Sequence, residues 1–467
     1  MAGNDIALMA HLMTRAGFGA TRDELDVRLS SGYDETVEDL LHPERQERVD
    51  RLDFLRYHPW AWRPGTMSNP GSTSWLYHMI TTDRPLEEKM TLFWHQIFAT
   101  GVSKVDHWDE VADMIDVFRA KGMGSYRELL LAVSKSPAMI FWLDNHENRA
   151  GSINENWGRE LLELFSMGVG TYTEEDVLEC SRAFTGWTIK HKLPRFPYGR
   201  FDWSFQFIEQ DHDDGVKLFL GQEGRFNGDD IIGIICRQPA TARFISRHLY
   251  NFFVADEVQV PAWSTTPPRD PDAIDILANS FIDSEGDIRS TLRVLFHSDF
   301  FKQARHARVK SPAEVVVNTM RLMGGAEFPV PGYGELARQP GYLGQELLDP
   351  PSVEGWHTGV EWIDTGALIE RVNFLTSMVG DIHRPGIKSI VGEIRANAPM
   401  TPEALVDASL DLMGALEVGA ESRRSLVDHA GRDGELSWRD DQEVADSTQK
   451  VLFLLKMIVS SKEYSLA

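Results

Sequence analysis

The chain has 467 residues, of which 42% are hydrophobic, so it can bury a large core, and its length alone allows two or three domains. Acidic residues outnumber basic ones by 71 to 47, and this formal net charge of -24 argues against nucleic acids or anionic membranes as the main binding partner. No signal peptide and no apolar run of membrane-spanning length is visible, which predicts a cytoplasmic protein for the chain as given. No nucleotide-binding or haem-binding motif is visible either.

Helices are predicted through the first third of the chain, including one over residues 85–100. Before it, residues 58–75 form a loop rich in Trp, Pro and Gly, which is either a lid over a pocket or a hydrophobic cover on the core. His95 lies among large apolar residues of the predicted helix. Its ring nitrogens need partners there, which a carboxylate from a neighbouring helix would supply. Alternatively, His95 is a metal ligand or a general acid/base.

The most informative stretch runs from Ser152 to Trp187 and reads SINENWGRELLELFSMGVGTYTEEDVLECSRAFTGW. Its two helical patterns, separated by GVG, predict an αα-hairpin whose second helix begins near Thr173. The first helix has an apolar side and a polar side. The polar side is either a solvated face with a Ser152–Glu155 capping box or a functional site. The density of hydrogen-bonding groups favours the site; the groups are Asn154, Glu155, Asn156, Arg159, Glu160 and Glu163.

A polar connection, DNHENR, precedes this stretch and adds His146 and further acids close in sequence to Glu155. Three such groups can hold a divalent cation, but none of the usual metal-binding spacings is present. A divalent metal is therefore possible from composition alone, and its identity is unknown.

After Trp187 the pattern changes, because aromatic residues alternate with polar ones from Phe201 to Phe207, which predicts a strand. We expect this strand to pair with residues 217–220, forming a small β-hairpin insertion near 200–221. Between them, His212 and Asp213 lie in the sequence DHDDG. This segment is either a plain acidic turn or a hairpin tip that projects into a cleft.

The rest of the chain is predicted to be helical, including residues 228–236, 271–283 and a helical C-terminal part over 365–467. A Pro- and Gly-rich loop over 349–359 contains Trp356 and is expected to form the wall of a pocket. The fold class is mainly α, with many helices and one small β-hairpin.

Several blocks together resemble a bacterial domain-of-unknown-function family, numbered eighteen hundred, from about Met9 to the C-terminus. The blocks are EKMTLFWHQIFATG, NENWGRELLELFSMGVGTYTEEDVLECSRAFTGW, DHDDGVKLFLGQEGRFNGDDII, ATARFISRHLYNFFV, KSPAEVVVNTMRLMG and DPPSVEGWHTGVEWI. The resemblance implies one large helical domain over 1–467, in place of two or three. It also implies frequent export and association with a sulfatase-like protein, although this chain lacks a signal sequence. Its motif positions are His95, Asn154, Glu155, Asn156, Arg159, Glu160, His212, Asp213, Gly215 and Trp356.

The leading hypothesis is an enzyme that hydrolyses a polar substrate, possibly a carbohydrate, by acid/base or metal-assisted chemistry. A carboxylate and an imidazole in one partly desolvated cleft can be tuned to act as acid and base. The candidate catalytic residues are Glu155, Glu160, His95 and His212, and the candidate substrate-binding residues are Asn154, Asn156, Arg159, Asp213 and Trp356. The alternative is a non-catalytic binding or assembly protein whose polar cluster is a structural salt-bridge network.

Overall fold

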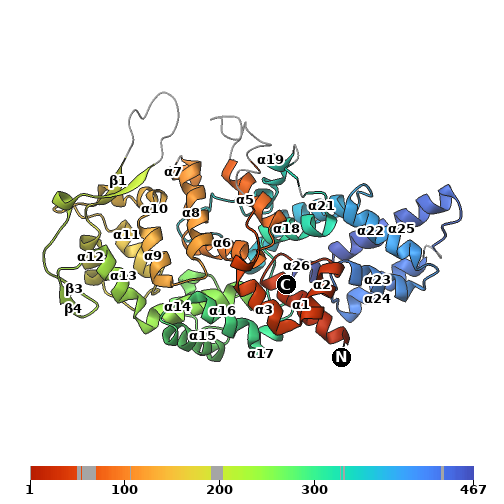
Figure 1. The fold of residues 1–467 in the computed structure, drawn as a ribbon, viewed down its shortest axis with the longest axis horizontal. Helices are drawn as coiled ribbons and strands as arrows, with labels where there is room; N and C mark the ends of the chain where they lie inside the picture. Colours follow the sequence, from red (N-terminus) through yellow and green to blue (C-terminus); the bar gives the residue numbers. More distant parts are fainter. Residues whose placement is uncertain are drawn as a thin grey trace, which may run out of the picture.

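The computed structural model describes residues 2–49, 54, 70–105, 107–190, 203–326, 328–329, 332–432 and 436–467. The fold is mainly α, as predicted. The body is elongated, with α11 to α13 and the short strands at one end and α22 to α25 at the other (Figure 1). Of the predicted Trp-rich loop over 58–75, residues 58–69 lie outside the described residues, and residues 70–75 open helix α5.

The N-terminal half is a series of helices joined by short turns. These are α1 (Ala2–Arg15), α2 (Arg22–Ser31), α3 (Tyr33–Leu41), the 3-10 helix η1 (Pro43–Arg45), α5 (Pro70–Thr81), α6 (Pro85–Ile97), α7 (Val102–Val105), α8 (Trp108–Lys121), α9 (Tyr126–Ser134), α10 (Pro137–Trp142), η3 (Asn145–Glu147), α11 (Asn156–Glu163) and α12 (Glu174–Ala183). Helices α11 and α12 form the predicted αα-hairpin, and Thr173 caps α12 in a capping box with Asp176. The Ser152–Glu155 capping box does not form, since α11 begins at Asn156 with Glu155 as its N-cap residue.

The described residues form two small antiparallel sheets, and their strand pairing differs from the prediction. Strand β2 (Ser204–Phe207) pairs with β1 (Trp187–Lys190), and β3 (Lys217–Phe219) pairs with β4 (Gln222–Gly224). The residues over 201–207 and 217–220 therefore do not pair with each other as expected. The reason is local, because Leu220 and Gly221 both have positive φ, 46° and 76°, as a tight two-residue hairpin turn requires. Because of this turn, β3 pairs with the strand that directly follows it, β4. Residues 201 and 202 lie outside the described part of the chain.

The described residues of the C-terminal half are also mainly helical, including those over 365–467. Its elements are η4 (Glu209–Asp211), α13 (Gly228–Cys236), α14 (Pro239–Phe253), η5 (Val260–Ser264), α15 (Pro271–Asp283), α16 (Ile288–His297), α17 (Asp299–Lys302), α18 (Pro312–Met323), α19 (Tyr333–Leu336), α20 (Gln339–Tyr342), η6 (Gly359–Ile363), α21 (Thr365–Val379), α22 (Pro385–Ala396), α23 (Pro402–Leu412), α24 (Ala420–Arg432), α25 (Asp441–Val459) and α26 (Lys462–Ser465).

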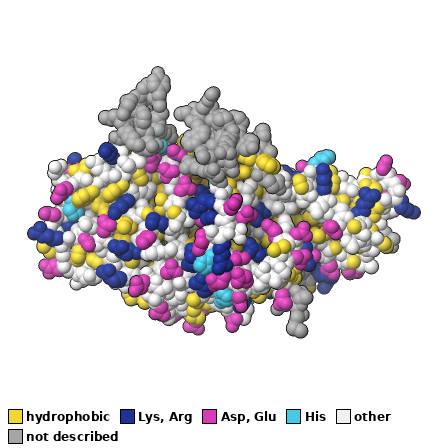
Figure 2. All heavy atoms as spheres, viewed as in Figure 1, with side chains coloured by type: hydrophobic (Ala, Val, Ile, Leu, Met, Phe, Trp, Pro, Cys, Tyr) yellow, Lys and Arg dark blue, Asp and Glu magenta, His cyan; other side chains and the backbone are white. Residues whose placement is uncertain are grey.

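Buried apolar side chains form one continuous cluster that runs from Met9 in α1 to Tyr464 in α26. A second, much smaller cluster contains Val309, Trp356 and Trp362. The organisation of residues 1–467 as one domain stays a prediction. Acidic and basic side chains are interspersed over the face shown in Figure 2. Among the described helices, none combines the length and apolar character needed to cross a bilayer.

Candidate functional site

The connection between α10 and α11 is folded back on itself by a tight turn. Arg149 and Ser152 form an isolated antiparallel bridge, and Gly151 between them has a φ of 80°. Such a φ is readily adopted only by glycine, which explains the residue at this position. The turn sends the chain back past η3 to the start of α11.

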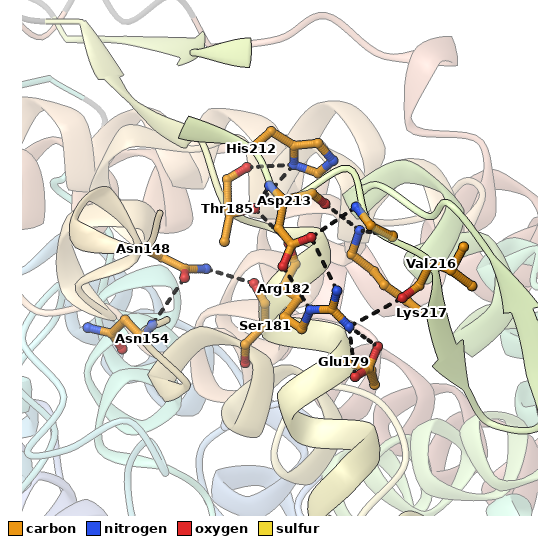
Figure 3. Close-up of polar contacts among 11 residues, drawn as sticks. Asn148, Asn154, Glu179, Ser181, Arg182, Thr185, His212, Asp213, Val216 and Lys217 are labelled. Atoms are coloured by element: carbon orange, nitrogen blue, oxygen red, sulfur yellow. Dashed lines mark hydrogen bonds and ion pairs between the residues drawn. The ribbon is translucent and has the colours of Figure 1, made fainter. Parts of the chain in front are cut away.

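Asn148 holds this connection against the rest of the molecule. Its buried side chain donates to Asn145 Oδ1 (3.1 Å) and to the backbone carbonyl of Ser181 (2.8 Å), and its Oδ1 accepts the Asn154 amide (3.0 Å). Its backbone carbonyl accepts the amide of Gly186 (3.1 Å). Figure 3 shows the side chain of Asn148 lying between Asn154 and Ser181. Every one of these groups is buried or half-buried. The Asn148 side-chain amide therefore connects the start of α11 to the end of α12 by hydrogen bonds.

A second network, around Thr185, forms the facing segment (Figure 3). The Thr185 hydroxyl donates to the carbonyl of Arg182 (2.6 Å) and accepts the amide of Asp213 (2.7 Å). His212 Nδ1 lies 2.9 Å from the Thr185 carbonyl, so this nitrogen carries the proton and donates. Asp213 accepts from Arg182 Nε (2.8 Å), and this hydrogen bond lowers the pKa of Asp213 despite partial burial. His212 and Asp213 are thus already engaged within the fold.

Between these two networks lies an open hollow of about 770 Å³. Its walls come from the connection before α11 and from the segments around Gly186 and Asp211, which the Ala150 amide joins by donating to the Asp211 carbonyl (2.8 Å). Most of its lining is polar, and we call it the asparagine hollow. The lining residues are His146, Glu147, Asn148, Arg149, Ser152, Ile153, Asn154, Glu155, Gly186, Thr188 and Asp211.

Two of the predicted site residues, Asn154 and Glu155, line the asparagine hollow. Asn156 lies close by and donates to Asp144 Oδ2 (3.3 Å). Arg159 turns to Glu174, with 2.7 Å between its NH2 and Glu174 Oε2, and is 3.4 Å from Glu155 Oε2. The hydrogen bond with Glu174 raises the pKa of Arg159. Glu155 is therefore only weakly paired and remains exposed to the hollow.

Glu160 lies in α11, more than one turn after Glu155, and does not line the hollow. Its carboxyl group is half-buried, and burial, together with the neighbouring charge of Glu163, raises its pKa to about 7. The charge of Glu354, in the predicted wall loop, acts in the same direction. This carboxyl group therefore changes charge near neutral pH, at a position separate from the hollow.

His95 and Trp356 lie together in the interior, not at the hollow. The His95 side chain is fully buried, and its ring centroid is 5.2 Å from that of Trp356 and 5.5 Å from that of Trp75. Neither ring nitrogen has a hydrogen-bond partner within the described residues, so the carboxylate expected to satisfy them is not there. Burial lowers the pKa of His95 to about 3. The imidazole is neutral and enclosed by aromatic rings.

The imidazole that does line the asparagine hollow is that of His146. Its ring stacks on Phe141 with the centroids 5.1 Å apart and the planes 5° from parallel. Its Nε2 lies 3.9 Å from Glu147 Oε1, and its Nδ1 is buried without a partner among the described residues. His146 is close in sequence to Glu155 but was not among the predicted site residues. Its position two residues before Asn148 in DNHENR was the available signal.

In the part of the chain that the structure describes, no three His, Cys, Asp or Glu side chains are grouped so that they could hold a metal ion. The comparison with protein families finds one match, to the model described as protein of unknown function (DUF1800), over residues 11–466. Among curated proteins and among solved structures, nothing matches the chain.

Proposed function

The chain belongs to the family described as protein of unknown function (DUF1800). Because that description assigns no reaction, we propose a function from the geometry of the chain. The asparagine hollow binds a small polar ligand that is rich in hydroxyl or amide groups, such as a saccharide. The observation that carries this proposal is a hollow of about 770 Å³ with a largely polar lining. This volume lies within the roughly 300–1,000 Å³ that small-molecule sites occupy.

The charges of the lining narrow the class of ligand. Glu147, Glu155 and Asp211 contribute three carboxylates against the single guanidinium of Arg149. An anionic ligand would meet net repulsion there, whereas a neutral or cationic one would not. Carboxylates accept hydrogen bonds from hydroxyl and ammonium groups, so a neutral sugar or an amino sugar fits best.

The frame around the hollow supports binding, because its own polar groups are already satisfied. Asn148 and Thr185 direct their side-chain hydrogen bonds to the backbone and, in the case of Asn148, also to the Asn145 side chain, which fixes both walls before a ligand binds. A site that is formed in advance loses less conformational entropy on binding. Glu155 and Asp211 then remain as the groups that contact the ligand.

A second candidate function, acid/base hydrolysis in the same hollow, is supported by one further observation. His146 and Glu155 both line the hollow, so an imidazole and a carboxylate face the same bound molecule. In hydrolysis, one member of such a pair can protonate the leaving oxygen or nitrogen of a glycosidic or amide bond, while the other takes a proton from the attacking water. In this version His146 takes the role that was predicted for His95 and His212.

The test measures binding of a panel of neutral and amino-bearing oligosaccharides by calorimetry. We expect Glu155→Gln and Asp211→Asn each to weaken binding about tenfold or more, as the loss of one charge-assisted hydrogen bond does, without changing the unfolding temperature. Glu175→Gln, an exposed acid on α12, is the matched control and should bind as the wild type does. Equal affinity in all three variants, or no binding of any panel member, contradicts the proposal. For the second candidate, His146→Gln should bind a saccharide but not release its cleaved product.

A further inference from the structure

The connection between α14 and α15 contains a loop, residues 258–268, whose two ends are joined at its base. The carboxylate of Glu257, directly before the loop, accepts the amide of Arg269, directly after it, at 2.7 Å. Inside the loop, the ring nitrogen of Trp263 donates to the carbonyl of Val258 (2.7 Å). A loop with adjacent ends and contacts of its own can move as one unit about its base. We call residues 258–268 the Trp263 strap.

The side chain of Trp263 packs the strap against α14. Its ring centroid lies 4.5 Å from the guanidinium carbon of Arg247, 4.6 Å from the ring centroid of His248 and 5.6 Å from that of Phe244. Arg247 NH1 also donates to the carbonyl of Thr266 in the strap (3.0 Å). The contacts between the strap and α14 therefore centre on two consecutive residues of the helix, Arg247 and His248.

The strap also contacts the segment around η6. Gln259 Nε2 donates to the carbonyl of Thr358 and to Glu361 Oε1, both at 3.1 Å. The strap thus connects α14 to η6, which is distant in sequence. Lifting the strap from α14 would break these two hydrogen bonds as well.

His248 is buried under the Trp263 ring. Its exposed fraction is 7%, and its Nε2 has no hydrogen-bond partner among the described residues. A proton on this ring would add a second positive charge beside Arg247, in a place that water does not reach. Burial, together with the charge of Arg247, lowers the pKa of His248 to about 3. While the strap is docked, the imidazole is therefore neutral.

No acid of the strap or its base is free to pair with a protonated His248. The strap itself, residues 258–268, contains no ionisable side chain. At its base, Glu257 accepts Nε and NH2 of Arg247 (3.2 and 2.7 Å) through one carboxylate oxygen and the amide of Arg269 through the other. Both oxygens of this carboxylate are thus engaged.

The other elements beside this part of α14 offer no acid either. On α15, Asp275 forms an ion pair with Arg243, one turn before Arg247. The turn between α11 and α12, where Gly168 packs against Phe244, has no ionisable side chain over 166–171. A positive charge on His248 can therefore be stabilised only by water.

We propose that the Trp263 strap is an acid-sensitive latch, which is docked on α14 while His248 is neutral and opens when His248 takes up a proton. Lifting the strap lets water reach the imidazole, which then binds a proton at the ordinary histidine pKa of about 6.5. The open form binds a proton that the docked form excludes, so its population rises as pH falls below 6.5. The latch acts on the contacts of α14 and η6, and it does not depend on what the asparagine hollow binds.

Amide hydrogen exchange of the full-length protein, followed by mass spectrometry, measures the opening. The amides of Ala262, Thr265 and Thr266 donate within the strap and should exchange when it opens, because so short a turn is unstable alone. After correction for the intrinsic exchange rate, their protection should fall about 30-fold between pH 7.5 and pH 5, the factor by which a free histidine then favours the open form. Peptides from α15 should change far less. Unchanged protection of the strap contradicts the proposal.

His248→Phe identifies the trigger. This variant keeps an aromatic ring against Trp263 and Phe244 but cannot bind a proton, so the protection of the strap should no longer depend on pH. His11→Phe is the matched control, because burial also lowers the pKa of His11 to about 3 but this residue lies in α1. It should keep the pH dependence of the wild type. The same fall in His248→Phe as in the wild type would overturn the proposal.

If His248→Phe does not fold, exchange of the ring C2 hydrogen of His248 in the wild-type protein decides. This exchange should be much slower than in free histidine at pH 7.5, because the strap covers the ring. Exchange at the rate of free histidine, with a midpoint at the ordinary pKa of about 6.5, would mean that the strap does not control the proton. That result counts against the latch.

Discussion

The asparagine hollow and the interior around α6 and α18 both contain ionisable side chains, but in opposite settings. In the hollow, Glu155 and His146 face a solvent-accessible space. In the interior, His95 is enclosed by aromatic rings and Glu314 is enclosed by cations. Leaving a polar group unpaired costs little free energy in water and much in the core. Substitutions in the interior should therefore change stability, while those in the hollow should change binding.

The largest effect is expected from Glu314→Ala. This substitution leaves Lys89 and Arg308 buried without their acid, and breaking a buried ion pair in this way costs about 3–5 kcal/mol. Urea unfolding monitored by tryptophan fluorescence measures the difference.

The control for Glu314→Ala is Asp407→Ala, which removes an ion pair with Arg423 on the surface. An exposed pair contributes about 0–1 kcal/mol, so this variant should unfold almost as the wild type does. Similar losses in the two variants would mean that the interior is not electrostatically distinct from the surface.

Asn148→Ala should have the next largest effect on the unfolding free energy. The Asn148 side chain is buried, yet the residue also lines the hollow. Its buried amide makes three hydrogen bonds that fix one wall of the hollow, and losing them costs about 1–3 kcal/mol in unfolding free energy. We also expect weaker ligand binding, since the wall is no longer held in place. Asn397→Ala, at an exposed asparagine, should change stability by no more than about 0.5 kcal/mol. Stability loss with unchanged binding would separate Asn148 from the site.

Local signals predicted the helices well. The predicted helix over 228–236 matches α13, because Asn227 caps it through both Asp229 and Asp230. The helix over 271–283 matches α15, where Asp270 is the N-cap and Pro271 occupies the first turn. The strand pairing could not be predicted in the same way. A period-two pattern identifies a strand, but its partner depends on turns and on segments distant in sequence.

The residues of the candidate site were predicted only in part, for the same reason. Asn154 and Glu155 stand in the stretch whose polar density was visible in the sequence, and both line the hollow. His95 and His146 could not be ranked, because their exposure is decided by packing. Trp75 approaches His95 from the preceding helix and Trp356 from a segment far away in the chain, and the wall facing His146 comes from residues near 186 and 211.

His95→Phe should have the smallest effect on the unfolding free energy at neutral pH. Its pH dependence is the sharpest test of the difference between the interior and the hollow. At pH 8 the imidazole is neutral and, among the described residues, its two buried ring nitrogens have no partner, so an aromatic ring of similar shape should leave stability unchanged or slightly higher. Below pH 6.5 the unfolded chain protonates this histidine, whereas the folded chain, with a pKa of about 3, does not. Because the unfolded state then binds more protons, the wild type loses stability as pH falls from 6.5 towards 3.

For His95 alone this loss is about 2 kcal/mol at pH 5, and His95→Phe should recover it. Burial also lowers the pKa values of His11 and His248 to about 3. These two histidines should therefore still make the unfolding free energy of His95→Phe fall as pH falls. Met90→Leu, a core change in the same helix without a titratable group, should keep the wild-type slope. An unchanged slope in His95→Phe would contradict a neutral, enclosed imidazole. Loss of ligand binding at pH 8 with intact folding would instead assign His95 to the site, because a residue that only fills the core has no reason to affect the hollow.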